Sequence, residues 1–322
     1  MKLLRLLPAV LGALAVCAGA HAQSYPSRPV RMVIPLAPGG VTDAMGRLLA
    51  QKFNEAWGQP VIPENRPGGA GMIAAEVVTK ANADGHTLLL GNINTHGINP
   101  SLYSKMPYDP VKDFAPITLL VTVPNLLLVH PSVPANNAQE LIALANARPG
   151  SLNASSPGNG TSGHMGVAVF SAMSGVRVNH VPYKGPAPAL QAVISGETQM
   201  LFDTIFQALP HVKAGRVRAL GVSVPQRSPL APEIPTIAEQ GLAGFNVSPW
   251  FALFSTAGTP RAVIGKIHAE TLKVMNGAEV SERLQSQGLK IETGSPQDLA
   301  RYVEREIARW AKVVKEAGIK VE

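Results

Sequence analysis

The alternation of strand-like and helix-like segments is the feature that most restricts the fold of this chain. Apolar strand patterns such as VRMVIPLA (30–37) and HTLLLGN (86–92) are separated by helical patterns such as TDAMGRLLAQKFNEAWG (42–58), where Thr42 or Asp43 is predicted to be the N-cap. Alternating strands and helices favour parallel sheets covered by helices. We expect about nine to ten strands, which is many for a single open sheet in a chain of 322 residues.

Two extended segments that contain proline divide this α/β pattern. They span residues 121–127 and 245–254, and the first is predicted to break into two strands around Pro124, because proline is unfavourable in a central strand. Both segments are predicted to cross between two lobes, and the C-terminal helices to return to the first lobe. The expected architecture is a two-lobed α/β protein that closes on a ligand in its cleft. The predicted boundaries are residues 23–123 and 247–322 for lobe 1 and residues 124–246 for lobe 2.

The C-terminal segment SPQDLARYVEREIARWAKVVKEAG (295–318) is predicted to form one long helix. Ser295 and Asp298 have the spacing of a capping box at its start. Its apolar residues recur at helical spacing, so we expect them to form a stripe that packs on the core. Trp310 belongs to this stripe and is therefore expected to be a core residue.

The N-terminal residues 1–22 predict a secretory signal peptide that is cleaved after Ala22. They combine a positively charged start, a short apolar run and a small-residue end, and the apolar run is too short for a comfortable membrane anchor. The single cysteine, Cys17, lies inside this segment, and Val16 before it is a poor fit to a lipoprotein cleavage site. The mature chain is thus expected to be exported and to have no disulfide and no thiolate metal site.

Two glycine-rich segments each run from the end of a strand into the start of a helix. They are PLAPGGVTD (35–43) and SSPGNGTSGHMG (155–166). Glycine permits positive φ and close backbone approach, and the N–H groups and dipole of a helix N-terminus attract an anion such as a carboxylate or phosphate. The alternative is that each glycine only serves a tight turn. The candidate ligand-binding residues in these two loops are Pro38, Gly39, Gly40, Val41, Thr42, Asp43, Gly158, Gly160, Thr161 and His164.

Three other places carry candidate ligand-binding side chains. Asn92, Thr95 and His96 follow another strand, where the alternative is a simple loop. Asp203 in MLFDT either caps a turn or meets a cationic group such as an ammonium. Trp250 either forms a wall of the cleft or packs the crossing segment. Ligands of open α/β sheets bind beyond the carboxyl ends of strands, which is where most of these residues are expected to lie.

The second loop also contains the G-x-G-x-x-G pattern of dinucleotide-binding proteins. That reading needs an acidic residue about 20 positions further on to hold the ribose, and no Asp or Glu occurs between Leu141 and Gly196. Basic residues in that region leave an NADP-dependent oxidoreductase as an open alternative. Because export separates the chain from nicotinamide cofactors, we expect no cofactor.

Several other functional classes lack their sequence signatures. The chain has no G-x-S-x-G, H-E-x-x-H, Walker or EF-hand pattern, so we expect no enzyme activity. None of the eight histidines has a partner at metal-ligand spacing, so no metal site is expected. The net charge of +7 is scattered and aromatic residues form 5% of the chain, which argues against nucleic-acid binding.

Many segments in one order resemble the Bug-type solute-binding receptors of tripartite tricarboxylate transporters. The resemblance covers essentially the whole chain after the predicted signal peptide, and its specificity comes from the number of shared segments. One departure is Met45-Gly46, where many relatives have apolar residues followed by alanine; Gly46 either loosens the helix start or makes room for a ligand. The segments are YPSRPVRMVIPLAPGGVTD, VIPENRPGGAG, DGHTLLLGNINTH, NPSLYSKMPYDPVKDFAPIT, NASSPGNGTSGHM, VPYKGPAPALQAVISGETQMLFDT, LPHVKAGRVRALGVS and EIPTIAEQG.

The resemblance implies a periplasmic receptor with the two-lobed periplasmic-binding-protein fold (type II, Venus flytrap). It implies that residues 38–43 and 158–164 hold a ligand carboxylate, partly through ordered water, while Asp43 caps its helix or holds a water. In relatives that take amino acids, Asp203 would meet the ligand ammonium. The expected ligand is a di- or tricarboxylate, an aromatic acid or an amino acid. The expected receptor is a monomer that serves the membrane subunits of a transporter, with a sensory receptor for a membrane kinase and an exported α/β enzyme as alternatives.

Overall fold

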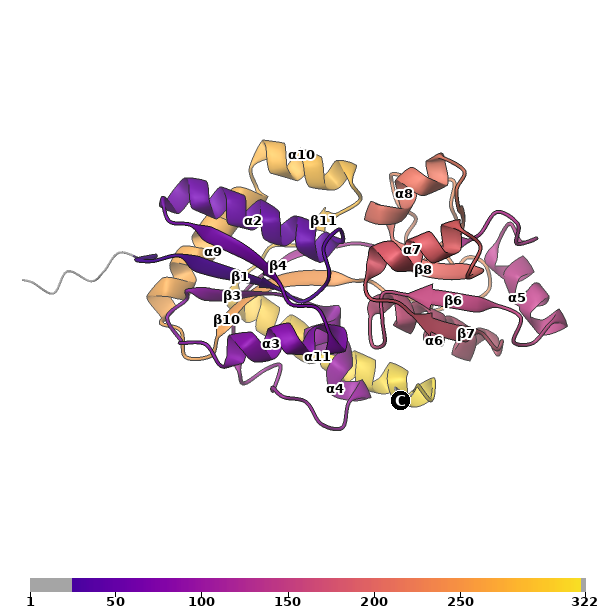
Figure 1. Cartoon of the computed structure of the whole chain (residues 1–322), viewed down its shortest axis with the longest axis horizontal. Coiled ribbons are helices and arrows are strands. Elements are labelled where there is room, and N and C mark those ends of the chain that lie inside the picture. The colour runs from indigo at the N-terminus through magenta and orange to yellow at the C-terminus, as the bar shows by residue number, and fades with distance from the viewer. Residues whose placement is uncertain (1–24, 320–322) are drawn as a thin grey trace, which may run out of the picture.

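Two β-sheets, each covered by helices on both faces, form the two lobes of the protein (Figure 1). The computed structural model describes residues 25–319, so the predicted signal peptide and Cys17 lie outside the described residues. The six-stranded sheet has the order β11-β4-β10-β3-β1-β2, and the five-stranded sheet has the order β7-β6-β8-β5-β9. The expected two-lobed α/β fold is confirmed.

The lobe with the six-stranded sheet contains both ends of the described chain. Its strands are β1 (Val30–Ile34), β2 (Val61–Asn65), β3 (Thr87–Asn92), β4 (Phe114–Thr122), β10 (Trp250–Thr256) and β11 (Lys290–Ile291). Its helices are α2 (Val41–Trp57), η2 (Gly69–Gly71), α3 (Met72–Thr79), η3 (Asn94–Ile98), α4 (Asn99–Leu102), α9 (Arg261–Met275), α10 (Ala278–Ser286) and α11 (Pro296–Glu316).

The lobe with the five-stranded sheet is built from the middle of the chain. Its strands are β5 (Asn125–Val129), β6 (Asn153–Ser156), β7 (Asn179–Pro182), β8 (Met200–Thr204) and β9 (Arg218–Val222). Its helices are α5 (Ala138–Ala147), α6 (Ser162–Ser174), α7 (Pro186–Ile194) and α8 (Ile205–Lys213). Two apolar clusters, one on each face of the sheets, continue from one lobe into the other.

The sheets are mixed, where the alternation of strands and helices led us to expect parallel ones. In the first sheet β10 runs antiparallel to β3 and β4, and in the second β5 runs antiparallel to β8 and β9. Each of these strands is the first after the chain crosses between the lobes. A strand that enters directly from the cleft runs away from it, whereas strands such as β1, β3, β6 and β8 run toward it. One central strand in each sheet is therefore reversed.

The crossing segments confirm the predicted break at Pro124. β4 ends at Thr122 and β5 begins at Asn125. The return segment is irregular until β10 begins at Trp250, so the strands end on either side of the crossings. The two segments are nevertheless bonded, because the N–H of Val123 donates to the carbonyl of Pro249 at 3.0 Å.

Two helix starts test the capping predictions. The capping box of Ser295 and Asp298 is confirmed at the start of α11, and Trp310 of this helix is fully buried. The N-cap of α2 is Gly40, so the prediction of Thr42 or Asp43 was wrong. Gly40 is the last residue with extended backbone, while the Asp43 carboxylate reaches back to the N–H of Gly39 and draws the loop into the helix start.

Gly46 has a packing explanation. A Cβ on this residue would lie 2.6 Å from Cδ1 of Ile34, so glycine lets α2 pack closely on β1. Separately, none of the helices within residues 25–319 combines the length and apolar character needed to span a membrane.

Candidate functional site

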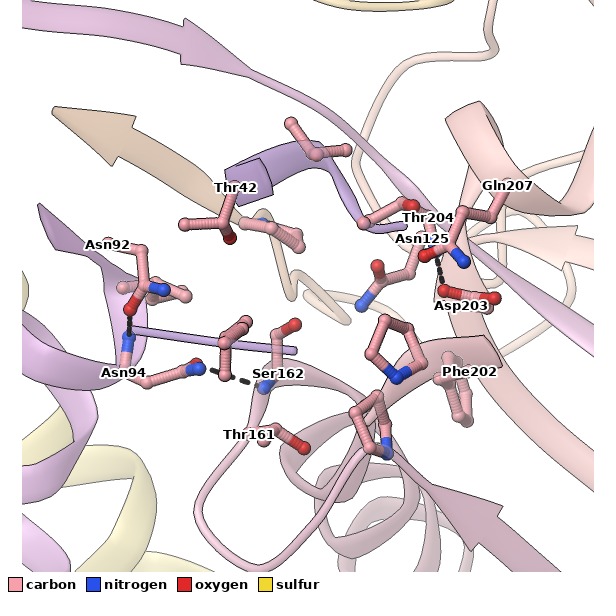
Figure 2. Close-up of a pocket in the computed structure, with 18 of the residues that line it drawn as sticks. Thr42, Asn92, Asn94, Asn125, Thr161, Ser162, Phe202, Asp203, Thr204 and Gln207 are labelled. Atoms are coloured by element: carbon pink, nitrogen blue, oxygen red, sulfur yellow. Dashed lines mark hydrogen bonds between the residues drawn. The ribbon is translucent and has the colours of Figure 1, made fainter. Parts of the chain in front are cut away.

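The carboxyl ends of four strands meet at a small cavity between the two lobes (Figure 2). The cavity has a volume of about 50 Å³ and lies between the N-termini of α2 and α6. Residues after β1 and β3 form one wall, residues after β6 and β8 form the other, and the crossing segments close its end. The residues that line it are Leu36, Gly40, Val41, Thr42, Asn92, Ile93, Asn94, Asn125, Pro157, Thr161, Ser162, Gly163, Pro186, Phe202, Asp203, Thr204, Gln207, Pro249 and Phe251.

The N-terminus of α2 presents unused hydrogen-bond donors to this cavity. Its N-cap is a glycine, and no side chain of the described chain caps it. The N–H groups of Val41 and Thr42 have no acceptor among residues 25–319. The Thr42 side chain also faces the cavity (Figure 2). Free N–H groups at the positive end of a helix dipole favour an anionic group here.

Asp43 holds this loop in place from behind. Its carboxylate accepts hydrogen bonds from the N–H of Gly39 (3.2 Å), Nε of Arg47 (3.0 Å) and Nδ2 of Asn65 (3.0 Å). Burial raises the pKa of Asp43, but the hydrogen bonds from Arg47, Asn65 and Gly39 outweigh that effect and hold it below its usual value. Asp43 therefore stays ionised and fully paired. Neither it nor the exposed Pro38 and Gly39 lines the cavity.

The N-terminus of α6 is already bonded by its own loop. Oγ1 of Thr161, the N-cap, accepts from the N–H of His164 at 3.4 Å and donates to the carbonyl of Gly158 at 2.7 Å. Nδ1 of His164 accepts from the N–H of Gly160, which has φ +73°. Thr161 lines the cavity and Gly158 lines the larger cavity that adjoins it, whereas Gly160 and His164 lie behind as loop supports.

A stacked pair of histidines packs behind this second loop. The rings of His164 and His180 are 4.0 Å apart. Burial lowers the pKa of each to about 4, and for His180 the neighbouring His164 adds to this effect. Both rings are therefore neutral at pH 7, and Nε2 of His180 lies 2.6 Å from the hydroxyl of Ser156. His164 acts here as an acceptor within the loop and is not a cationic ligand contact.

The segment after β3 connects the two walls. Oδ1 of Asn92 accepts from the N–H of Asn94 (2.9 Å) and of Thr95 (3.2 Å), which fixes the turn. Oδ1 of Asn94 accepts from the N–H of Ser162 at 3.2 Å, a bond from one lobe to the first residue of α6 in the other (Figure 2).

Thr95 and His96 follow in the same segment but lie in the core behind the cavity. Oγ1 of Thr95 is 2.8 Å from Nδ1 of His96, and the His96 ring stacks on Phe254 at 3.9 Å. Burial lowers the pKa of His96 to about 3, so it is a neutral core residue at pH 7. Neither residue lines the cavity.

The wall after β8 contains polar atoms without a partner. Oδ1 of Asp203 accepts from the N–H of Thr204 at 2.8 Å, while Oδ2 has no partner among the described residues. Nδ2 of Asn125 and Oγ1 of Thr204 are also buried without a partner in the described part of the chain. Burial raises the pKa of Asp203 to about 7, against one hydrogen bond from Thr204. Such atoms are expected to bond a ligand or water.

Trp250 does not line this cavity. It is fully buried, and its Nε1 donates to Oε2 of Glu306 at 3.0 Å, while the next residue, Phe251, forms part of the cavity wall. The structure thus places Trp250 in the packing of α11 against β10.

A larger cavity of about 500 Å³ adjoins the first one. The two share Leu36, Pro157 and Thr161, and the larger one extends outward between Tyr103 of one lobe and Lys184 of the other. Lys184 is the single cationic side chain among the described residues that line either cavity. The inner site is therefore built from neutral donors, and its wider outer part leads to solvent.

Sequence reasoning missed several residues of the inner wall: Leu36, Asn94, Asn125, Thr204 and Gln207. Ser162, in the second glycine loop, was expected to supply a hydroxyl donor and does line the cavity. Asn94 lies within the segment after β3, whose neighbouring residues Asn92, Thr95 and His96 were recognised as candidates. Asn125 follows the crossing at Pro124, and its position at the cavity depends on how the two lobes meet.

This fold and this site define a class of protein: a two-lobed solute-binding protein of the periplasmic-binding-protein type. The family model described as "Tripartite tricarboxylate transporter family receptor" (TctC) matches residues 45–319. The chain therefore belongs to the TctC family, which also includes the Bug proteins. The family places it among receptors for solutes and not among enzymes.

Solved structures agree with this assignment. Rpa4515 of R. palustris, solved with adipate, is 38% identical with a TM-score of 0.89 and covers 92% of this chain and 99% of its own. MatC of Rhodopseudomonas palustris, solved with bound malate, is 35% identical with a TM-score of 0.86 over 90% of this chain and 100% of its own. The periplasmic binding protein BugD is 30% identical with a TM-score of 0.87 over 92% of this chain and 100% of its own.

Proposed function

We propose that this protein is a periplasmic receptor that binds a small carboxylate between its lobes and delivers it to the membrane subunits of a tripartite tricarboxylate transporter. The observation that carries this proposal is the uncapped N-terminus of α2, which faces the N-terminus of α6 across the cavity. A carboxylate at this point receives N–H donors and two favourable helix dipoles without any basic side chain. The ligands of Rpa4515 and MatC, both carboxylates, support the same chemistry.

The ligand contacts that we propose come from both lobes. Gly40, Val41 and Thr42 supply donors from α2, and Thr161 and Ser162 supply them from α6. There the ligand replaces the Gly158 carbonyl as the acceptor from the Thr161 hydroxyl and Asn94 as the acceptor from Ser162. Pro38, Gly39 and Asp43 in the first loop, and Gly158, Gly160 and His164 in the second, position these donors. The rest of the ligand extends toward the outer cavity beside Tyr103 and Lys184.

Ligand capture would involve closure of the lobes about the two crossings. We propose that residues 23–123 with 247–322 move against residues 124–246, because each of these parts contains one complete sheet. Within residues 25–319 the chain passes between these two parts at Val123–Pro124 and in the segment before Trp250, and both crossings are irregular. A ligand that bonds both helix N-termini favours the closed form, since these bonds exist together only when the lobes meet.

Calorimetric titration of the purified protein tests this proposal. Mono-, di- and tricarboxylates, aromatic acids and acidic amino acids are titrated, with NAD and NADP included as the competing class. We expect one carboxylate class to bind, and Thr42→Val to weaken it about tenfold or more, because it removes a hydroxyl donor to a charged group. Ser286→Ala, a hydroxyl removal on the outer helix α10, is the control and should leave affinity unchanged. Binding of NADP alone would refute the proposal.

A further inference from the structure

Asp203 would share its cavity with the carboxylate of the ligand. Asp203 is one of the residues that line the small cavity that we assign to the ligand carboxylate, and its Oδ2 atom is buried without a partner among the described residues. The cavity holds about 50 Å³, and no Lys, Arg or His is among the described residues that line it. Two carboxylates that share a buried site without a cation repel each other strongly, so one of them takes up a proton.

The elements around Asp203 do not supply a compensating positive charge. Its strand, β8, lies between β6 and β5, whose sequences NASS and NLLLV contain no charged residue. Helix α7 contains no titratable residue, and on α6 the titratable residue is the neutral His164. On α8, His211 and Lys213 stand in the last turn, at the opposite end from Asp203.

The other charged side chains near this part of the fold are either paired with each other or lie far from Asp203. Across the cleft, Asp43 is paired with Arg47, and behind Trp250 Glu306 is paired with Arg309. Arg218 pairs in register with Val129, whereas Asp203 pairs with Leu126 near the other end of β5. Among residues 25–319, the N–H of Thr204 is the one group that hydrogen-bonds the Asp203 carboxyl group, and no side chain with a positive charge stands beside it.

We propose that Asp203 binds as a protonated carboxyl group beside the ligand, so that the receptor takes up one proton with each carboxylate. This inference rests on the proposed function, and it makes Asp203 a specificity-determining residue. In its neutral form Asp203 tolerates an anion and can donate a hydrogen bond to it. In its ionised form it would instead require a ligand with a cationic group, such as an ammonium.

The proposal predicts a specific pH dependence of affinity. Burial places the pKa of Asp203 in the empty site at about 7, and a neighbouring carboxylate raises it further. Affinity is then constant below the pKa of the empty site and falls above it, because Asp203 must be protonated before the ligand binds. Between pH 6 and pH 8 the Kd should rise about tenfold, with nearly one proton taken up per ligand at pH 8.

Calorimetry at pH 6, 7 and 8 in buffers of different ionisation enthalpy measures both quantities. The probes are adipate, malate and L-glutamate, and the variants are Asp203→Asn and the control Glu282→Gln, an exposed carboxylate on α10. We expect proton uptake with adipate or malate in the wild type and in Glu282→Gln. Asp203→Asn, which cannot ionise, should bind the carboxylate without proton uptake and with the same Kd at pH 6 and pH 8.

Other outcomes would overturn the proposal in distinguishable ways. Carboxylate binding without proton uptake by the wild type refutes it and leaves the receptor function intact; this measurement does not depend on the variant. Binding of glutamate alone, with a loss of a hundredfold or more in Asp203→Asn, shows that Asp203 is ionised and pairs with an ammonium. If no carboxylate binds the wild type at any of these pH values, the proposed function fails as well.

Discussion

The two helix N-termini that face each other across the cleft differ in how their donors are used. At α2 the N-cap is Gly40, and the first N–H groups have no protein acceptor within residues 25–319. At α6 the N-cap Thr161 accepts from His164, and Ser162 donates to Asn94 of the other lobe. One terminus is thus open to a ligand, and the other is already satisfied when the site is empty.

This difference suggests that the two helix N-termini contribute differently to ligand binding. A carboxylate gains full hydrogen bonds at α2, because free donors at a helix N-terminus await an acceptor. At α6 the Ser162 N–H already bonds Asn94, so a carboxylate there gains only the difference in free energy between the new hydrogen bond and the one it replaces. We therefore expect α2 to contribute most of the affinity and α6 to contribute closure.

The two loops are supported by groups with different pKa values, so their contributions to stability should be lost at different pH values. Behind α2 lies the ionised Asp43, with its pKa below the usual value; behind α6 lie His164 and His180, with their pKa values lowered by burial to about 4. Neutral histidines stabilise the fold above their unfolded pKa of about 6.5, and that stability is lost as the pH falls toward 4. The contribution of Asp43 is lost only below about pH 4.

We therefore predict that the largest effect is acid destabilisation between pH 6.5 and 4, of up to about 3 kcal/mol for His164 and less for the partly exposed His180, where solvent screens the charge. Urea unfolding at several pH values measures it, and His180→Gln should reduce the slope by about one proton. NMR titration of the two imidazole rings provides an independent check. A normal titration of both rings near pH 6.5 would contradict the buried, neutral pair.

The second prediction concerns the open terminus. Val41 is the first residue of α2, and proline fits that helix position while it removes the N–H. Val41→Pro should weaken carboxylate binding about tenfold to a hundredfold, because a hydrogen bond to a charged group contributes roughly 1.5–3 kcal/mol. Calorimetry gives the affinity and circular dichroism confirms an intact helix. An unchanged Kd would mean that this N–H does not contact the ligand.

The third prediction applies the same change to the satisfied terminus. Ser162 is the first residue of α6, and Ser162→Pro removes the N–H that bonds Asn94. In the wild type the ligand bond to Ser162 replaces the bond to Asn94, so its loss costs less affinity than the loss of a free donor. We expect the Kd to rise about threefold to tenfold, less than for Val41→Pro. The comparison of the two variants is the test. A larger loss for Ser162→Pro would reverse the proposed roles of the two helices.

Local patterns in the sequence were sufficient for the two-lobed architecture and for the two helix starts that meet at the cavity. The alternation of strands and helices, the break at Pro124 and the capping box at Ser295 each depend on neighbouring residues, and the structure confirms them. The two glycine loops were recognised for the same reason, since a strand end, glycines and a helix start are consecutive in the chain. The family resemblance identified the receptor class from the same segments.

Only the tertiary structure decided how individual side chains are used. Asp43 turned from a predicted cap into an ionised support because Arg47 and Asn65, on other turns and strands, reach it. His164 became a neutral acceptor because it packs on His180, and Asn94 gained its role from a residue in the other lobe. Burial at the cavity leaves Oδ2 of Asp203 without a hydrogen-bond partner among the described residues. These outcomes depend on contacts between segments far apart in the chain, which spacing and composition do not encode.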